Sequence, residues 1–310
     1  MLKKTLLGMT LFFVFMLTAC GGNQASNPAN EDEKVKVTAT TGQIADIVKN
    51  VGKDHVEVTA LMGPGVDPHL YQASQGDISK LSKADMIFYN GLHLEGKMGE
   101  IFEKMKKGKP TIPVAERIPN GKLIHTKDSS GNVDPHVWFD IDLWIYAVGA
   151  VEEGLIKQDP KNKENYSNNA KEYVQKLKSL KEESQKRIGE IPEESRILVT
   201  AHDAFGYFGK AYGMDVMGLQ GLSTDSEYGL KDVQKIVDTL VDKNIKAVFI
   251  ESSISEKSIN AVVEGAKKQG HTVSIGGELF SDAMGEEGTD EGTYIGMYKH
   301  NIETIVSSLK

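Results

Sequence analysis

The chain is poor in residues that form covalent cross-links, since Cys20 is the only cysteine among its 310 residues. A single cysteine cannot form a disulfide within the chain. The stability of the folded protein must therefore come from a buried apolar core.

Basic residues are also in the minority, with 36 Lys and Arg against 44 Asp and Glu and a formal net charge of -8. An acidic surface repels phosphate backbones, so the composition argues against nucleic acid as a partner. It is compatible with the attraction of cations, although an acidic solvated surface is the commoner explanation.

Long apolar runs are missing except near the amino terminus. Two lysines precede an apolar stretch that ends at Leu17, which is too short to span a membrane and is typical of a secretory signal. Residues 17–21, Leu-Thr-Ala-Cys-Gly, have the form of a bacterial lipobox, in which cleavage leaves an amino-terminal cysteine that is diacylated and acylated at its amino group. We therefore expect a signal peptide at 1–19 and a lipid anchor at Cys20 on the extracytoplasmic face of the cell membrane.

Large apolar side chains are then absent from residues 22–34, which cannot contribute to a core. This composition predicts a flexible tether at 20–34 that joins the lipid anchor to the folded body.

Behind the tether, short β-branched runs alternate with stretches of helical spacing, which is the pattern of βαβ units. The pattern occurs twice and predicts two α/β lobes, at 35–158 and 193–310. Thr40 and Gln43 have the spacing of a capping pair for the first helix. The expected strands are Val35–Thr40, Val56–Leu61 and Met86–Asn90 in the first lobe, and Ile197–Thr200, Asp215–Leu219, Ala247–Glu251 and Thr272–Ile275 in the second.

A polar stretch at 159–192 separates the two sets of strands and has no glycine before Gly189. Apolar residues recur in it at intervals of three and four, which predicts one long helix, roughly 40–45 Å in length, with a single narrow buried stripe. A coiled-coil helix is the alternative, but the stripe covers barely two heptads. A rigid helix that links two lobes would permit only small movements on ligand capture. The stripe consists of Tyr166, Ala170, Tyr173, Leu177 and Leu180.

The tetrapeptide Val-Asp-Pro-His occurs twice, and it ends at His69 in the first copy and at His136 in the second. Proline fixes its own φ and restricts the preceding residue, so each histidine leaves its loop in a defined direction. A nearby acid could accept the second ring N–H and set the tautomer. Either copy alone could be a surface turn, but the repetition indicates a metal site that needs further ligands.

The second lobe offers two further candidates. His202 follows the expected strand at Ile197–Thr200, at the end where open α/β sheets bind ligands, although it could equally cap a helix or fill the core. We expect the next helix to open at Asp203 or Ala204. Asp282 comes just after the last strand and could instead be a loop acid or a helix cap.

Glu251 ends another expected strand, and its carboxylate could orient a ligand from outside the ligand set or simply face solvent. Of the other histidines, we expect His93 to be structural or to lie at the rim of the site. His55, His125, His271 and His300 are expected to be solvated.

Taken together, these segments resemble the metal-binding substrate-binding lipoproteins of ATP-driven manganese and zinc importers, and the similarity covers essentially the whole mature sequence. The resemblance implies two Rossmann-like lobes, a linking backbone helix, and one metal ion per chain in the interlobe cleft. The implied ligands are the residues at the matching positions, His69, His136, His202 and Asp282. The implied partners are an ABC importer permease and its ATPase, with the chain itself a monomer. The matching segments are Asp67–Tyr71, Tyr89–Glu95, Asp134–Trp138, Thr200–Phe205, Gly276–Leu279 and the helix before Ile191.

The metal itself is assigned by weighing two branches of this family. Zinc-binding members often carry a long loop rich in histidine and acids, whereas residues 121–131 are short and contain only His125. This favours Mn²⁺. Against it, many manganese-type members have glutamate at the position of His202, and three imidazoles with one carboxylate suit zinc well. We expect Mn²⁺, with Zn²⁺ as the alternative.

Two other classes of function are open to a His₃Asp site. A secreted zinc hydrolase would use the metal to activate water, but the sequence lacks His-Glu-x-x-His and has no convincing general base beside the ligands. A metal-stabilised adhesin would need a partner surface, and the sequence has no obvious one. We therefore expect a protein that is not an enzyme.

Overall fold

The computed structural model describes residues 33–126 and 132–310, and residues 34–310 belong to a single unit. The expected signal peptide, Cys20 and nearly all of the tether lie outside the described residues.

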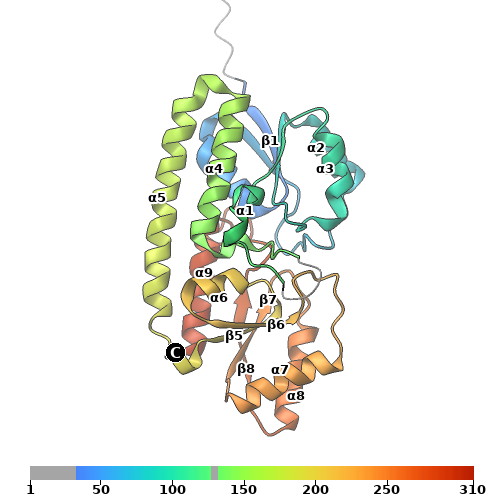
Figure 1. Cartoon of the computed structure of the whole chain (residues 1–310), viewed down its shortest axis with the longest axis vertical. Helices are drawn as coiled ribbons and strands as arrows, with labels where there is room; N and C mark the ends of the chain where they lie inside the picture. Colours follow the sequence, from blue (N-terminus) through green and yellow to red (C-terminus); the bar gives the residue numbers. More distant parts are fainter. Residues whose placement is uncertain (1–32, 127–131) are drawn as a thin grey trace, which may run out of the picture. The chain divides into compact units, whose positions relative to one another are not determined.

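The first lobe contains one parallel sheet in the order β2-β1-β3-β4, with helices on both faces (Figure 1). Successive side chains of β3 point to opposite faces of the sheet, and both sets are apolar, so helices must cover both faces. Met86 and Phe88 join the core formed with the first and fourth helices, while Ile87 and Tyr89 pack with the second and third. The elements are β1 (Val35–Ala39), α1 (Gly42–Gly52), β2 (Val56–Ala60), α2 (Gln75–Lys83), β3 (Met86–Tyr89), α3 (Gly99–Met105), β4 (Thr111–Pro113) and α4 (Ile141–Gln158).

The second lobe has two parallel two-stranded sheets, β5-β6 and β7-β8, and β5 lies beside β7. One face packs against α7 and α8, whereas Leu198, Phe249 and Leu279 belong to the same apolar core as the first lobe. The elements are β5 (Ile197–His202), α6 (Gly206–Tyr212), β6 (Asp215–Gln220), α7 (Leu230–Asp242), β7 (Ala247–Glu251), α8 (Lys257–Lys268), β8 (Ser274–Leu279) and α9 (Tyr294–Leu309).

The long helix α5 (Lys163–Ile188) packs against α1 and α4 of the first lobe and against α9 of the second (Figure 1). All five residues of the expected stripe are buried. At 26 residues the helix is about 39 Å long, slightly shorter than expected, because a 3₁₀ turn occupies Pro160–Asn162 and the helix ends at Ile188, before Gly189. The two-lobe α/β fold with one linking helix is confirmed.

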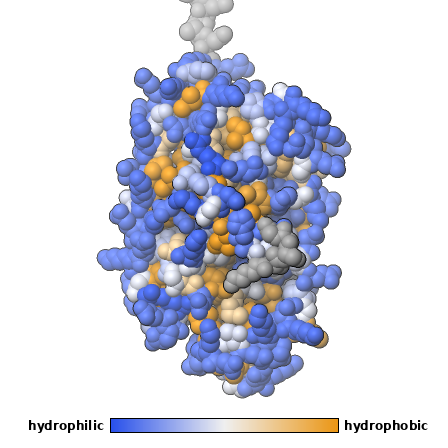
Figure 2. Space-filling view, in the orientation of Figure 1, coloured by the Kyte–Doolittle hydropathy of each residue, from blue (hydrophilic) through white to orange (hydrophobic). Residues whose placement is uncertain are grey.

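Aromatic contacts join the two lobes next to the linking helix. The rings of Phe139 and Phe205 stack with centroids 4.4 Å apart. The hydroxyl of Tyr294 donates to the carbonyl of Trp138 at 2.6 Å, and that of Tyr298 donates to the carbonyl of Phe139 at 2.8 Å. The turn that follows His136 is therefore fixed to α9. On the face shown in Figure 2, the surface around this core is mainly hydrophilic.

Several local expectations were wrong. Thr40 and Gln43 do not cap α1: its N-cap is Thr41, and the hydroxyl of Thr40 instead donates to the buried carboxylate of Glu95 at 2.6 Å. The helix after β5 begins at Gly206 rather than at Asp203 or Ala204.

Two strands also differ from the expected pattern. The short edge strand β4 was not expected, because it has three residues and ends in a proline, which only an edge or strand end tolerates. The last strand, β8, begins at Ser274 and continues to Leu279, beyond the expected Thr272–Ile275.

Candidate metal centre

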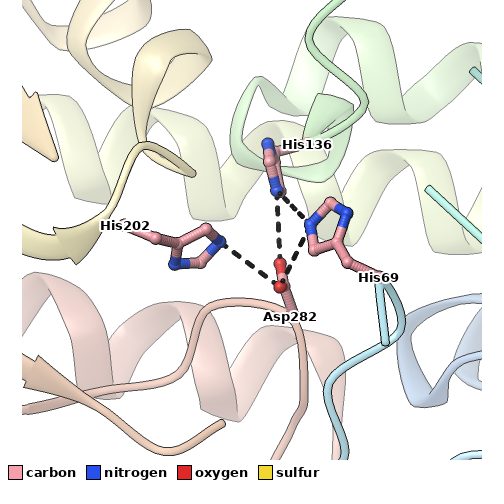
Figure 3. A group of neighbouring side chains, drawn as sticks. All are labelled: His69, His136, His202 and Asp282. Atoms are coloured by element: carbon pink, nitrogen blue, oxygen red, sulfur yellow. Dashed lines mark hydrogen bonds and ion pairs between the residues drawn. The ribbon is translucent and has the colours of Figure 1, made fainter. Parts of the chain in front are cut away.

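Four buried side chains meet at the junction of the lobes (Figure 3). One potential ligand atom from each lies within 4.8 Å of the others. The Nε2 atoms of the three imidazoles lie 3.3–3.5 Å from an oxygen of the single carboxylate. The four residues are His69, His136, His202 and Asp282.

Each lobe supplies two of these residues from a loop or a strand end. His69 lies in the loop between β2 and α2, and His136 directly precedes a 3₁₀ turn at Val137–Phe139. His202 is the last residue of β5, and Asp282 follows the end of β8. The sequence-predicted candidates thus lie side by side, at the carboxyl ends of parallel strands and in their loops, where α/β folds bind ligands.

Asp134 orients His136 through two contacts made by one carboxylate oxygen. Its Oδ1 accepts from the backbone N–H of His136 at 2.9 Å and lies 2.8 Å from ring Nδ1. A ring that donates from Nδ1 has its Nε2 lone pair free to bind a cation. Nε2 of His136 faces the centre of the group (Figure 3).

Glu251, at the end of β7, contacts the backbone N–H and the ring of His202, but with a different carboxylate oxygen for each. Its Oε1 accepts from the backbone N–H of His202 at 2.8 Å, and its Oε2 lies 2.5 Å from Nδ1. Burial alone would lower the pKa of His202, but the negative charges of Glu251 and Asp282 outweigh it and raise the pKa well above its usual value. The side chain of Glu251 is buried against His202 and does not face solvent.

Asp67 occupies the same place in its tetrapeptide as Asp134 but makes different contacts around His69. Its Oδ1 accepts from the backbone N–H of His69 at 2.8 Å, as in the second copy. Its Oδ2 accepts instead from the hydroxyl of Thr224, in the other lobe. The pKa of His69 is lowered to about 4 because burial disfavours the charged ring.

The carboxylate of Asp282 is the least satisfied group of the centre. Among the described residues, no donor makes a well-aligned hydrogen bond to either of its buried oxygens, and Nε2 of His202 makes none although it lies 3.3 Å from Oδ2. Burial alone would raise the pKa of Asp282, but attraction to His202 and the other imidazoles keeps it well below its usual range. Unpaired buried polar atoms are costly. Three imidazole nitrogens and a negatively charged carboxylate are suitable ligands for a divalent cation at the centre of the group.

The remaining histidines do not enter this group. His93 is exposed and has a positive φ of 65°, and His125 is also exposed. The expectation of solvated rings was wrong for three others, which are half-buried and hydrogen-bonded. Nε2 of His55 lies 3.1 Å from the side-chain amide of Asn165. Nε2 of His271 lies 2.6 Å from the carbonyl of Ile245, and Nε2 of His300 lies 3.0 Å from that of Glu278.

Sequence reasoning missed two residues that contact this site. Gln43 donates to the backbone carbonyl of Asp282, and Thr224 donates to Asp67. The only sequence signal was the polar side chain of Gln43 at the start of an otherwise apolar helix face, and it was misread as a cap.

The sequence profile described as "ZnuA: Zinc-uptake complex component A periplasmic" matches residues 37–308. The chain belongs to this family. Two relatives match over nearly their whole length. The manganese-binding lipoprotein MntA of Bacillus subtilis is 58% identical over 309 residues, covering 100% of both chains. The zinc-binding protein TroA of Treponema pallidum is 47% identical over 294 residues, covering 95% of each.

A solved structure of periplasmic zinc-binding TroA from Treponema pallidum has the same fold as this chain. It superposes with a TM-score of 0.86 and 48% identity, covering 89% of this chain and 99% of that one. The recognition of the family from its sequence motifs is confirmed by these matches.

Proposed function

We propose that this chain captures Mn²⁺ outside the cytoplasm and delivers it to the permease and ATPase of an ABC importer. The observation that carries the proposal is the buried group of three imidazoles around a carboxylate, neither oxygen of which accepts a hydrogen bond from residues 33–126 or 132–310. The relatives named above, a manganese-binding and a zinc-binding protein, support a metal as the cargo.

The ligands in this proposal are His69, His136, His202 and Asp282, and one ion binds per chain. The two Nδ1–carboxylate contacts fix the tautomers of His136 and His202, so that Nε2 binds the ion. Asp282 supplies one or two oxygens, and a second oxygen would suit the higher coordination number of Mn²⁺.

Manganese is preferred to zinc because the relative with 58% identity is named manganese-binding, and because the sequence segment 121–131 is short and has one histidine. Zinc is the second candidate, favoured by TroA and by the donor set. Affinity does not separate the two metals, since zinc binds more tightly than manganese at nearly any such site.

The organisation proposed with this function keeps the boundaries given by the sequence. Residues 1–19 are the signal peptide, 20–34 the tether, 35–158 and 193–310 the lobes, and 159–192 the linking segment. Cys20 carries the lipid anchor, and replacement by Ala is expected to release the protein from membranes. Among the described residues, none of the helices has the length and apolar character needed to cross a bilayer.

The protein acts in this proposal as a monomeric binding protein without catalytic activity. Four protein ligands leave little room for a substrate beside the metal.

Deletion of the protein in its own cell tests the proposal. The expected result is a growth defect that added Mn²⁺ corrects more effectively than Zn²⁺. Rescue by zinc alone, with unchanged cellular manganese, would transfer the assignment to zinc.

A further inference from the structure

Asp282 belongs by sequence to the second lobe, yet side chains of the first lobe hold its backbone. Nε2 of Gln43, in the first turn of α1, donates to the carbonyl of Asp282 at 3.1 Å and to that of Ser281 at 3.4 Å. Nε1 of Trp138 donates to the same Ser281 carbonyl at 3.1 Å. Both donors are buried.

The packing around these hydrogen bonds leaves the segment little freedom. A Cβ atom added at Gly42 would lie 3.2 Å from Cε of Met284, so the start of α1 approaches the segment closely. On the other side, Asn301 of α9 accepts from the N–H of Phe280 at 2.9 Å and donates to its carbonyl at 2.7 Å. The segment 280–284 is therefore held between α1, the turn after His136, and α9.

The carboxylate itself has no comparable support, because neither oxygen of Asp282 accepts a well-aligned hydrogen bond from the part of the chain that the structure describes. Its direction depends on where the backbone is fixed. Each oxygen faces imidazole nitrogen, with Oδ1 3.4 Å from Nε2 of His136 and Oδ2 3.3 Å from Nε2 of His202. Both oxygens are thus directed at the position that a metal ion would occupy (Figure 3).

Among the described residues, the hydrogen bonds of the Gln43 side chain go only to the carbonyls of Ser281 and Asp282. It caps no helix, and its Oε1 is buried without a hydrogen-bond partner. Burial of an amide is unfavourable unless its polar atoms are hydrogen-bonded. The two hydrogen bonds donated by Nε2 are therefore what offsets the burial of the Gln43 side chain.

We infer that Gln43 is a positioning residue that holds Asp282 so that both carboxylate oxygens can bind the metal, and that it thereby favours Mn²⁺ over four-coordinate Zn²⁺. The inference rests on the proposed function. Zinc is satisfied by three imidazoles and one oxygen, whereas manganese accepts more oxygen ligands. Without the amide of Gln43, the segment 280–284 can shift, and the second carboxylate oxygen of Asp282 no longer binds Mn²⁺.

The test is the replacement Gln43→Met, which keeps the length of the side chain and removes the donor. Mn²⁺ and Zn²⁺ affinities of the whole chain are measured by competition with a chelator of known affinity. Removal of a group that orients a ligand typically weakens binding about 10–100-fold, and we expect this loss for Mn²⁺ but less than about threefold for Zn²⁺. Gln75→Met is the matched control, because Gln75 is exposed in the first turn of α2.

A second variant, Trp138→Phe, removes the other donor to Ser281 and is expected to shift the ratio of affinities in the same direction. If Gln43→Met does not fold, the ratio of Mn²⁺ and Zn²⁺ affinities in Trp138→Phe tests the inference instead. The spectrum of bound Co²⁺ gives an independent readout, since four-coordinate Co²⁺ absorbs visible light more strongly than higher-coordinate Co²⁺. We expect stronger absorption in both variants than in the wild type.

A folded variant that keeps the wild-type ratio of affinities, or loses both metals equally, would overturn the inference while the metal-capture function stands. If the wild-type chain binds neither metal, the proposed function itself fails, and this inference fails with it.

Discussion

The hydroxyl of Thr224 donates to Oδ2 of Asp67 at 2.5 Å and so links the second lobe to the loop that carries His69. The other oxygen of Asp67 accepts from the backbone N–H of His69. One carboxylate therefore connects a metal-ligand candidate to the opposite lobe. A nearby ion pair, Lys97 with Asp225 at 3.1 Å, crosses the same gap, but it is exposed and contributes little.

Replacement of Thr224 by Val should speed release of the metal, because the loop that carries His69 loses its hydrogen bond to the second lobe through Asp67. A hydrogen bond to a charged group contributes about 1.5–3 kcal/mol, which corresponds to an increase of roughly tenfold or more in the dissociation rate. Stopped-flow mixing of the loaded protein with excess chelator measures this rate. Thr224→Ser retains the hydroxyl and should behave as the wild type; equal rates in the wild type and the Val variant would show that the contact plays no part in release.

Glu251→Gln should weaken metal binding without unfolding the protein. The amide can still accept from the backbone of His202, but an NH₂ group facing Nδ1 favours the tautomer that protonates Nε2. Loss of such an orienting partner typically costs about 10–100-fold in affinity. Titration calorimetry with Mn²⁺ checks the value, with Glu278→Gln as an exposed control in the same lobe. Unchanged affinity would show that Glu251 does not orient the ring.

The buried Asp46 predicts a pH-dependent term in stability that is independent of the metal. Burial raises its pKa above 3.8, although a 2.6 Å hydrogen bond from Tyr173 of α5 opposes the shift. A raised carboxyl pKa stabilises the fold below pH 3.8, and this contribution is lost as the pH rises through the folded-state pKa.

Asp46→Asn removes this titration while it keeps an acceptor for Tyr173. The stability of the variant relative to the wild type should therefore increase as the pH rises from below 3.8 to neutral. Urea unfolding of the metal-free proteins at both pH values measures the difference. Asp54→Asn, at an exposed position, is the control. A difference between Asp46→Asn and the wild type that does not change with pH would contradict the assigned cause.

Local pattern was sufficient for much of the fold. Side chains of β3 alternate between the two faces of the sheet, and the apolar residues of α5 lie along one side of the helix. Both arrangements follow from the period of a strand or a helix, so the sequence alone predicts them. The repeated tetrapeptide indicated His69 and His136 as metal-ligand candidates. His202 and Asp282 were ambiguous by local pattern alone, and the resemblance to the family implied all four, which the structure brings together. Their role as metal ligands stays a proposal.

The contacts that position the site were not predictable in this way. Gln43 and Asp282 are 239 positions apart, and Asp67 and Thr224 are 157 apart, so no local spacing connects them. The pair Thr40 and Gln43 fits a capping pattern, but each side chain has a tertiary partner, Glu95 for Thr40 and the Asp282 segment for Gln43. Tertiary contacts that satisfy buried polar groups prevailed over the local motif.

The most direct test of a metal centre between the lobes is calorimetric titration of the whole chain with Mn²⁺. We expect one ion per chain for the wild type and no measurable binding when His69 and His202 are both replaced by Ala. The variant His93→Ala, at an exposed position, should bind as the wild type does. Wild-type stoichiometry and affinity in the His69 and His202 double variant would show that the metal does not bind between the lobes at these residues.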